Sequence, residues 1–357
     1  MRIAFDAKRY FNNKTGLGNY SRSIVHALVS QFPEHDFFLI HNKEEKPLLD
    51  LPNLKTLSFR GKGGFWRTFL MAKDLQKFKM DVFHGLSNEI PTGLDKRKIK
   101  SVVTIHDVIF MRYPEYYRFF DRVIYRKKTG NAVKNANRIV ATSKATAADL
   151  QKYYLADSSK MEVVYQPVNE AFYLAKTGIP IVDGNYFIYV SSFTYRKNHG
   201  TLIQAFARIQ KMLDWNLVLV GIEGETYEAT KRFIQNEHLE NRVKIFKNAS
   251  QSDLVNLMQN ASAFVYPSLF EGFGIPLAEA AVCGLPIVAS NIGVFTELAE
   301  DAALFFHPNK YEEIADAMLR ITDPTLQAKL RLKLSKILHK VEHTGIAKQI
   351  MQLYAEI

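Results

Sequence analysis

Strand-like runs of hydrophobic residues alternate with segments of helical apolar spacing along the whole chain. Such alternation is typical of parallel sheets with helices packed on their faces, so the pattern predicts an α/β fold class. The predicted strands are 2–7, 37–42, 54–59, 82–86, 100–106, 138–143, 161–166, 186–192, 216–221, 243–247, 263–267, 286–290 and 303–306.

One segment interrupts this alternation. Residues 168–185 carry turn residues and little periodicity, so they are interpreted as a linker between two domains. A chain of 357 residues is also long for one core and suits two domains. Two doubly wound, Rossmann-like domains would each bind ligands at the carboxyl ends of their strands. There is no internal repeat and no low-complexity tract.

Composition indicates an ordinary globular protein, with 47% hydrophobic and 23% charged residues. The single cysteine, Cys283, excludes an internal disulfide framework and fits a reducing compartment. No apolar run approaches the length of a membrane span, and the first residues begin a strand without a signal peptide. We therefore expect a cytoplasmic protein.

The net charge of +11 is concentrated in one half of the chain. Residues 1–170 contain 29 Lys+Arg and 17 Asp+Glu, a net charge of +12, whereas residues 171–357 have a net charge of −1. The basic half indicates an anionic partner. No nucleic-acid-binding motif accompanies the charge, so we expect no nucleic acid partner. An anionic membrane surface or a lipid-phosphate acceptor explains the charge better.

The richest candidate chemistry lies in residues 268–279, SLFEGFGIPLAE. A predicted strand precedes the segment, and Pro276 suits the first turn of a helix, so Glu271 lies in the loop and Glu279 one turn into the helix. Glycines and a helix N-terminus favour an anion. Carboxylates beside an anion site need other partners, and sugar hydroxyls are the obvious ones. A phosphate-bearing sugar fits both parts; an ordinary loop with solvated glutamates is the alternative.

The run EGFGIPLAEA, followed by CGLPIVASNIG, resembles the signature of the retaining glycosyltransferases of family 4, which have the GT-B fold. The resemblance covers nearly the whole chain. It implies an acceptor-binding domain at 1–170 and a nucleotide-sugar-binding domain at 171–340. It also implies that a C-terminal helix within 341–357 crosses back to the first domain; residues 345–356 have the required apolar spacing.

The same resemblance assigns roles within the motif. Glu279 would hold the ribose hydroxyls of the donor, and Glu271 the transferred sugar. The donor site would also include the intervening residues, namely Gly272, Phe273, Gly274 and Ile275.

Arg196 and Lys197 follow the first predicted strand of the second half. Two adjacent cations at a strand's carboxyl end would stabilise a pyrophosphate leaving group, by about 1.5–3 kcal/mol for each charge-assisted contact. In the resembling family a basic pair in this loop does so. Many relatives carry a further arginine where this chain has Ser192, and Arg196 is a candidate to replace it. An exposed basic turn is the alternative.

Two candidate sites lie in the first half. His106 ends a predicted strand, and the resembling enzymes keep a histidine there that contacts the donor hexose; a purely structural histidine is the alternative. Gly16 and Gly18 match the glycine loop of that family, whose amides close over the donor phosphates. These glycines are not a dinucleotide fingerprint, because Ser21 replaces the third glycine, which argues against a nicotinamide oxidoreductase. His84 lies at a comparable strand end, but it is not proposed as a site residue.

No metal site is expected. The chain has no Asp-x-Asp sequence, no zinc-ligand spacing and no Walker loop. His339 and His343 lie four residues apart, but a solvated helix face explains them better.

Two aromatic and basic segments have two interpretations each. Residues 61–79 either place Phe65, Trp66 and Phe69 against a membrane, with Arg67 near the lipid head groups, or pack an apolar stripe on the sheet. Residues 112–126 are similar, and their place just after His106 makes them a candidate acceptor wall.

Together these features predict a retaining, metal-independent glycosyltransferase without a cofactor. It would move a hexose, with mannose from GDP-mannose as the first choice, to a glycan or lipid-linked acceptor in surface polysaccharide synthesis. The donor choice depends on the opening residues 3–18, which look most like mannosyltransferase-type members. The alternatives are a GT-B nucleotide-sugar epimerase and a non-catalytic, membrane-associated scaffold that binds sugar nucleotides.

Overall fold

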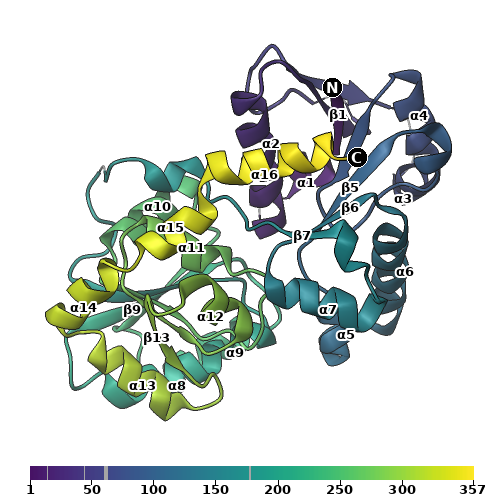
Figure 1. Cartoon of the computed structure of the whole chain (residues 1–357). Coiled ribbons are helices and arrows are strands. Elements are labelled where there is room, and N and C mark those ends of the chain that lie inside the picture. Colours follow the sequence, from purple (N-terminus) through teal and green to yellow (C-terminus); the bar gives the residue numbers. More distant parts are fainter. Residues whose placement is uncertain (14, 44, 60–62, 177) are drawn as a thin grey trace. The chain divides into compact units, whose positions relative to one another are not determined.

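A computed structural model describes the whole chain except residues 14, 44, 60–62 and 177. The chain divides into two compact units, Met1–Pro167 with Val341–Ile357, and Val168–Lys340 (Figure 1). The first unit therefore takes its last segment from the far end of the sequence.

The first unit contains a parallel sheet, seven-stranded in the part that the structure describes, with the order β3-β2-β1-β4-β5-β6-β7. Its strands are β1 Arg2–Asp6, β2 Asp36–His41, β3 Leu54–Ser58, β4 Val82–Gly85, β5 Lys100–Ile105, β6 Arg138–Ala141 and β7 Met161–Val163. Its helices are α1 Lys8–Asn12, α2 Gly16–Gln31, α3 Gly63–Phe65, the π-helix η1 Trp66–Leu70, α4 Met71–Lys77, α5 Ile109–Arg112, α6 Phe119–Asn135, α7 Lys144–Tyr154 and α16 His343–Ala355, with short 3₁₀ turns η2 Asp95–Arg97, η3 Pro114–Tyr116 and η4 Ser158–Lys160.

The second unit also has a parallel sheet, six-stranded within the described residues, with the order β10-β9-β8-β11-β12-β13. Its strands are β8 Asn185–Val190, β9 Trp215–Gly221, β10 Val243–Lys247, β11 Ala263–Tyr266, β12 Ile287–Ser290 and β13 Ala303–Phe306. Its helices are α8 His199–Ile209, α9 Tyr227–Asn236, α10 Gln251–Asn260, α11 Ile275–Val282, α12 Gly293–Ala299, α13 Tyr311–Arg320, α14 Pro324–Arg331 and α15 Ser335–Val341, with the 3₁₀ turns η5 Glu170–Tyr173 and η6 Tyr195–Lys197.

The predicted α/β fold class and all thirteen predicted strands are confirmed. In each sheet the strand order reverses between two neighbours, β1 and β4 in the first and β8 and β11 in the second. Ligands of doubly wound sheets bind at such a reversal, beyond the carboxyl ends of the strands. The topology therefore marks one candidate ligand site in each unit.

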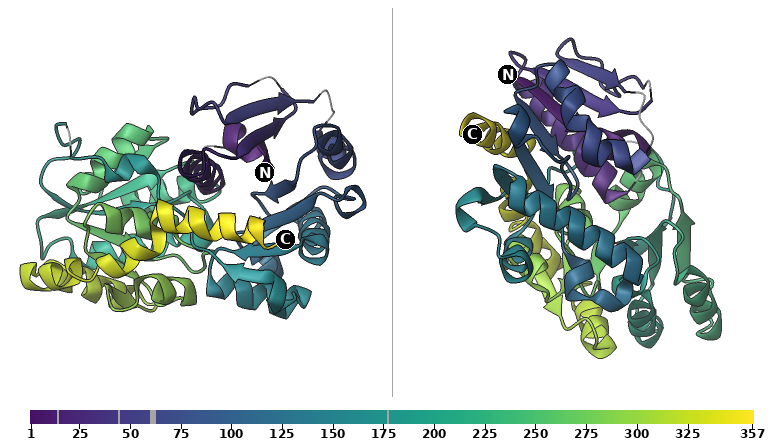
Figure 2. Two further views of the ribbon diagram at one scale, coloured as in Figure 1. Left: turned by 45° about the horizontal axis from the view of Figure 1, so that its top comes forward. Right: turned by 90° about the vertical axis from the view of Figure 1, so that its right-hand side faces the viewer.

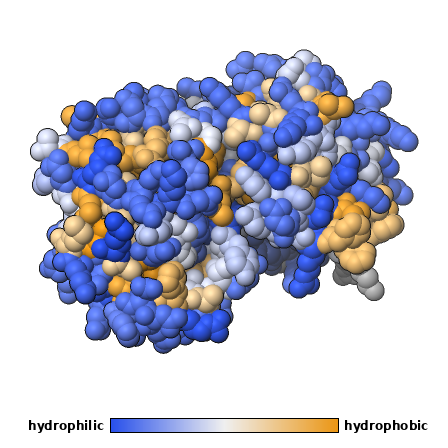
Figure 3. Space-filling model, turned by 90° about the horizontal axis from the view of Figure 1, so that it is seen from below, coloured by the Kyte–Doolittle hydropathy of each residue, from blue (hydrophilic) through white to orange (hydrophobic). Residues whose placement is uncertain are grey.

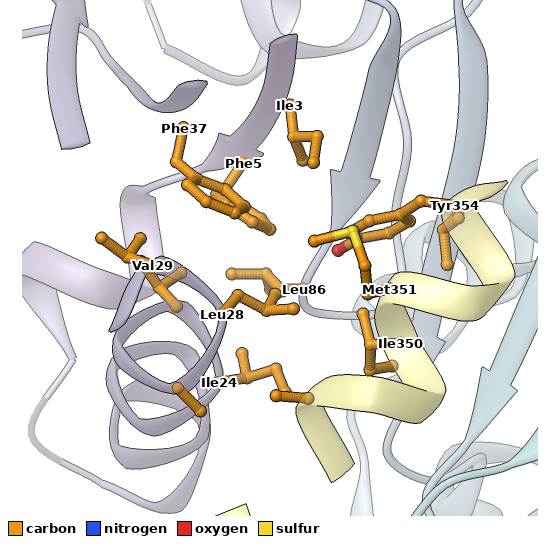
Figure 4. Packing of buried hydrophobic residues seen from close by; sticks show 14 of the residues in the cluster. Ile3, Phe5, Ile24, Leu28, Val29, Phe37, Leu86, Ile350, Met351 and Tyr354 are labelled. Atoms are coloured by element: carbon orange, nitrogen blue, oxygen red, sulfur yellow. The ribbon is translucent and has the colours of Figure 1, made fainter. Parts of the chain in front are cut away.

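Helices cover both faces of the first sheet, because alternate strand residues point to opposite faces. Phe5 packs against α2 and α16 on one face, and Ala4 belongs to the opposite cluster with Trp66 and Leu75. In Figures 1 and 2 α16, drawn in yellow, lies beside α2. Figure 4 shows Ile350 and Met351 of α16 directed at the cluster. Burial of one such side chain stabilises the unit by about 1.5–3 kcal/mol.

The expected linker differs from the structure. The first unit ends at Pro167, and residues 168–185 belong to the second unit. Phe172 of η5 is buried, the Asn256 carboxamide accepts from the Ile181 amide at 3.2 Å, and Gln259 donates to the Leu174 carbonyl at 2.9 Å. A segment without hydrophobic periodicity is thus held by hydrogen bonds from α10, which a periodicity argument does not detect.

Candidate active site

The loop between β11 and α11 has the conformation that its glycines require. Gly274, immediately before α11, has φ of 91°, a left-handed conformation that favours glycine. A Cβ atom at Gly274 would lie 2.5 Å from Cε1 of Phe295, so glycine is also required sterically. Pro276 lies in the first turn of α11, and the helix ends before Gly284, whose φ is 72°. The predicted strand, loop and helix are confirmed.

The loop after β8 is joined to this loop by two hydrogen bonds. The Leu269 amide donates to the Arg196 carbonyl at 2.8 Å, and the Asn198 carboxamide donates to the Pro267 carbonyl at 3.0 Å. Because β8 and β11 are the neighbours at which the strand order reverses, the two loops meet at the candidate ligand site of the second unit.

Glu271 is the centre of a buried ion cluster. Its Oε2 accepts from Arg196 Nη1 at 2.9 Å, and its Oε1 accepts from Lys197 Nζ and, at 3.2 Å, from the Tyr266 hydroxyl. Burial alone would raise the pKa of Glu271, but the charges of Lys197 and Arg196 lower the pKa to about 2. Glu271 is therefore ionised, and it holds both cations in place.

Lys197 is fixed from several directions. The side chain is buried, and its Nζ also lies 5.6 Å from the centre of the Tyr266 ring. The Tyr189 hydroxyl donates to the Lys197 carbonyl at 2.7 Å. A pre-oriented ammonium group loses little side-chain entropy when it binds an anion.

Glu279 has a different environment. Its exposed fraction is only 3%, and within the described residues its carboxylate makes no hydrogen bond or ion pair. Burial raises the pKa of Glu279 to about 8, so the free protein holds it protonated at neutral pH. Its oxygens therefore keep hydrogen-bonding capacity for a ligand that donates hydrogen bonds.

The second unit thus brings together Arg196, Lys197, Glu271 and the start of α11. One carboxylate is ionised and paired, and the other, Glu279, is neutral and unpaired. Phe273 is buried, and Gly272, Gly274 and Ile275 complete the turn into the helix. Such a site offers fixed cations and a helix N-terminus to an anion, together with a hydrogen-bond acceptor to hydroxyl groups.

His106 lies in the first unit, just beyond β5, and both of its ring nitrogens are engaged. Nε2 donates to the Leu86 carbonyl at 2.9 Å, and Nδ1 accepts from the Gln166 carboxamide at 3.2 Å. The Tyr20 ring packs edge-on against the imidazole at 4.7 Å. Burial lowers the pKa of His106 to about 4, so the imidazole is neutral.

His84, which was not a predicted site residue, belongs to a buried polar network. It lies 2.6 Å from the Tyr354 hydroxyl and 2.8 Å from the Thr104 hydroxyl, and burial lowers its pKa to about 3. Because Tyr354 comes from α16, this neutral histidine ties the last helix to the first sheet.

Gly16 and Gly18 begin α2, also in the first unit. A Cβ atom at Gly18 would lie 1.8 Å from the Asn13 carbonyl oxygen, so no other residue fits there. The Asn13 side-chain oxygen accepts from the amides of Thr15 at 2.8 Å and Gly18 at 3.0 Å. The Gly18 amide is therefore already engaged within the loop. Gly16, the other candidate, is exposed.

Two family models together match most of the chain. Residues 15–172 match Glycosyltransferase Family 4, and residues 176–338 match Glycosyl transferases group 1. The chain belongs to this glycosyltransferase family. The predicted family and enzyme class are thereby confirmed.

Individual relatives agree with this assignment. The chain is 26% identical to "O-antigen chain mannosyltransferase B" of Escherichia coli over 355 residues, which cover 90% of both proteins. It is 30% identical to "GDP-mannose:cellobiosyl-diphosphopolyprenol alpha-mannosyltransferase" of Xanthomonas oryzae over 186 residues, which cover 50% of this chain and 47% of the relative.

The solved structure of Anabaena HepE in complex with UDP and glucose is similar in fold. Its TM-score is 0.76 at 17% sequence identity, and the match covers 100% of both chains. The similarity of this glycosyltransferase to such structures confirms the predicted GT-B fold.

Two structural features are absent from the described residues. No group of three or more His, Cys, Asp or Glu side chains is arranged to hold a metal ion there. No helix in the part of the chain that the structure describes is long and apolar enough to cross a membrane.

Several residues that surround Glu271 were not predicted. Tyr266, Tyr189 and Ser268 fix the ion cluster by hydrogen bonds, and Phe295 packs on Gly274. Tyr266 could have been predicted from the sequence, because it is the last residue of a buried strand next to the motif. Phe295 follows the motif by many residues and gave no local signal.

The aromatic segment at 61–79, whose first two residues lie outside the described part, is partly buried in the core and partly exposed. Trp66 is buried in the core, whereas Phe65 and Phe69 are exposed. Arg67, which the membrane interpretation placed near lipid head groups, forms ion pairs with Asp6 and Glu89. For Arg67 the structure therefore favours the core-packing interpretation, because two carboxylates distant in sequence surround it.

Proposed function

We propose that this glycosyltransferase is a retaining, metal-independent enzyme that moves mannose from GDP-mannose to a glycan or lipid-linked saccharide in surface polysaccharide synthesis. The second unit would bind the nucleotide sugar and the first unit the acceptor. The observation that carries the proposal is that Glu271 holds the buried Lys197 and the partly exposed Arg196 at the loop before α11, the helix that carries the buried Glu279.

In this proposal Arg196 and Lys197 stabilise the diphosphate as its charge grows. Glu279 accepts hydrogen bonds from the ribose hydroxyls, which supply the partners that its carboxylate lacks. Glu271 already accepts hydrogen bonds from Arg196, Lys197, Tyr266 and Ser268, so it positions the cations and offers the transferred sugar only its remaining lone-pair capacity. Gly272, Phe273, Gly274 and Ile275 direct backbone N–H groups at the phosphates.

The chemical step is proposed as a front-face displacement. The acceptor hydroxyl oxygen forms a bond to the anomeric carbon while the bond from that carbon to the diphosphate oxygen breaks. The hydroxyl proton passes to the departing phosphate, so no protein nucleophile is required. His106, neutral and held by Leu86 and Gln166, would present its ring edge to the donor hexose, and the loop with Gly16 and Gly18 would lie over the phosphates.

The choice of mannose rests on the relatives. The names of the Escherichia coli and Xanthomonas oryzae proteins specify mannosyl transfer, and the second name specifies GDP-mannose and a diphosphopolyprenol-linked acceptor. The HepE structure contains UDP and glucose, so UDP-hexoses are the second choice.

The deciding experiment is calorimetric titration with GDP, UDP, ADP and dTDP, with and without EDTA, followed by assay of GDP-mannose turnover. We expect GDP to bind equally well with and without EDTA. The Glu279→Ala variant should bind it more weakly by about 1–3 kcal/mol, because the hydroxyl contacts are lost. Binding of a different nucleotide would overturn the mannose assignment, and unchanged affinity in a folded Glu279→Ala protein would remove the ribose role.

Two alternatives give different results in the same assay. A GT-B nucleotide-sugar epimerase would convert its substrate without any acceptor, and a scaffold would bind nucleotides but release no nucleoside diphosphate with any acceptor mixture. Release of GDP that depends on an added saccharide acceptor excludes both.

We also propose that the first unit contacts an anionic membrane surface through α6. Phe120 is 78% exposed and Phe119 67%, and Ile124 follows Phe120 by one turn of the helix. Arg122 and Arg126 lie on the same helix, so α6 carries cationic groups as well as exposed apolar ones, and cationic groups favour an anionic lipid surface. Figure 3 shows hydrophobic side chains at the surface of the first unit, on the right of that view.

Vesicle co-sedimentation tests this contact. The Phe120→Ser variant should bind less to phosphatidylethanolamine vesicles that contain phosphatidylglycerol, and the wild type should bind little when phosphatidylglycerol is absent. The control is Leu332→Ser, which changes an exposed side chain of the second unit. Equal loss in both variants, or no loss in either, would contradict the proposal.

A further inference from the structure

A row of hydrogen-bonded polar side chains, called here the core network, crosses the apolar core of the first unit. The Tyr354 hydroxyl of α16 lies 2.6 Å from His84 Nδ1, and His84 Nε2 lies 2.8 Å from the Thr104 hydroxyl. The Thr104 hydroxyl in turn lies 2.9 Å from the Tyr20 hydroxyl of α2. The exposed fraction of these four residues is at most 3%, so the core network is shielded from solvent.

The core network lies on the same face of the sheet as His106. Alternate residues of a strand point to the same face. Val82 of β4 and Val102 of β5 belong to the cluster that α2 and α16 cover, so His84 and Thr104, two positions further along, face the same helices. His106 follows Thr104 by two more residues.

Tyr20 is the member of the core network that touches His106. The two ring centroids lie 4.7 Å apart, with 86° between the ring planes. The hydrogen bonds of His106 with Leu86 and Gln166 lie near the imidazole plane, so they restrain tilting of the ring less than sliding. A perpendicular ring whose own hydroxyl is held by Thr104 opposes this tilt.

The Tyr354 hydroxyl is not needed to pack α16 on the sheet. Figure 4 shows Tyr354 directed into the same cluster as Ile350 and Met351. The other buried residues of α16 are all apolar, namely Ile346, Ala347, Ile350, Met351 and Leu353. Burying a hydroxyl costs free energy unless it is hydrogen-bonded, so phenylalanine would suffice at this position if the helix only covered the sheet.

His84 can join the two ends of the core network because it is neutral. Burial lowers the pKa of His84 to about 3. A neutral imidazole has one donor and one acceptor nitrogen, so it can accept from one hydroxyl and donate to the other. Within the described residues none of the four side chains keeps a buried polar atom without a partner. Fully satisfied buried networks of this kind are rigid.

We infer that Tyr354 and His84 are positioning residues for the transfer reaction. Through Thr104 and Tyr20 they hold the imidazole of His106 in the orientation that it presents to the donor hexose. The inference rests on the proposed function, because the contact of His106 with the donor is taken from there. The last helix thereby contributes to the reaction from within the core, without touching the substrate.

Tyr354→Phe tests the inference, because it removes one hydroxyl and keeps the ring. We expect kcat for GDP-mannose turnover to fall about ten-fold while KM and nucleoside diphosphate affinity stay unchanged, because alignment is lost and donor binding by the second unit is not. Thr104→Val, which interrupts the core network between His84 and Tyr20, should have the same effect.

The matched control is Tyr10→Phe. It removes another buried tyrosine hydroxyl of the first unit, which lies 2.8 Å from His26 Nε2 and outside the core network, and kcat should not change. Thermal unfolding shows whether each variant is folded. Equal loss of kcat in the control, or unchanged kcat in folded Tyr354→Phe and Thr104→Val, would overturn the inference.

A double-mutant comparison separates positioning of His106 from general loosening of the core. In a His106→Gln background, Tyr354→Phe should cause no further loss of kcat, because its effect passes through the imidazole that is already absent. A loss of the same size in both backgrounds would mean that Tyr354 acts on the fold and not on His106.

Nitrogen NMR of the histidine side chains gives a readout that needs no turnover. The His106 signals, assigned by their loss in His106→Gln, should shift or broaden in Tyr354→Phe and stay unchanged in Tyr10→Phe. If the wild type does not turn over GDP-mannose, the proposed function fails, and this comparison still decides whether Tyr354 orients His106. If the wild type is active but the His106 signals are the same in both variants, the inference alone fails.

Discussion

At the residue scale, the two glutamates of the motif differ because their neighbours differ. Glu271 lies among Arg196, Lys197 and Tyr266, whereas Glu279 lies in an apolar part of α11. The same type of side chain is therefore ionised in one position and protonated in the other. Because the two pKa values differ, the role of each glutamate can be tested by its own pH dependence.

Glu271→Gln should lower the free energy of unfolding of the second unit by roughly 3–5 kcal/mol, because the buried Lys197 and the partly exposed Arg196 lose their counter-charge. The pKa of Glu271 is about 2 in the folded protein, below its usual value of 4.5, so its stabilisation is present above pH 4.5 and is lost as the pH falls toward 2. Urea unfolding at several pH values measures the effect.

The matched control for this substitution is Glu300→Gln, which removes an exposed carboxylate paired with Lys340. Exposed pairs contribute little, so the control should leave the unfolding free energy close to that of the wild type. If the difference in unfolding free energy between wild type and Glu271→Gln did not shrink below pH 4.5, the assigned ion pairs would be contradicted.

Nucleoside diphosphate binding should release protons at pH 7 through Glu279. The pKa of Glu279 is about 8 in the free protein, and hydroxyl donors of the ligand favour the ionised form, so the carboxyl group loses its proton on binding. Calorimetry in two buffers of different ionisation enthalpy measures the release. It should fall toward zero above pH 8 and be absent in Glu279→Gln; proton uptake would contradict the role.

At the element scale, the loop before α11 depends on one glycine. Gly274→Ala should destabilise the second unit by about 1–3 kcal/mol, because φ of 91° is strained for alanine and the new Cβ meets Phe295. The control is Gly345→Ala within α16, where a Cβ meets nothing, so it should stabilise the first unit by about 0.5–1 kcal/mol. Thermal unfolding compares them, and equal signs would contradict the prediction.

At the scale of the whole molecule, the last helix, α16, stabilises the first unit and not the second unit, which directly precedes it in the sequence. Ile350→Ala should destabilise the first unit by about 2–5 kcal/mol, because Ile350 is completely buried among residues of α2 and the first sheet. Hydrogen exchange resolved by peptide should show faster exchange in the first unit alone.

Leu330→Ala in α14 is the reciprocal control for this helix. Leu330 is buried within the second unit, so its truncation should accelerate hydrogen exchange there and leave the first unit unchanged. If either variant loosened both units to the same extent, the division into separate cores would be contradicted.

The sequence by itself determined the strands, the fold class, the family and the place of the motif. Strand runs such as 263–267 are readable because alternating hydrophobic segments and glycine or proline boundaries are local properties of the chain. The same locality placed Glu279 in a helix after Pro276 and predicted the C-terminal helix near 345–356.

Only the tertiary structure decided which charges meet. The pairing of Arg67 with Asp6 and Glu89, the packing of residues 168–185 on α10, and the hydrogen bond between His84 and Tyr354 join segments that are far apart in sequence. Burial and distance, which fix a pKa and the strength of an ion pair, arise from this long-range packing and not from local pattern. For that reason the motif was readable in the chain, whereas the opposite protonation states of Glu271 and Glu279 were not.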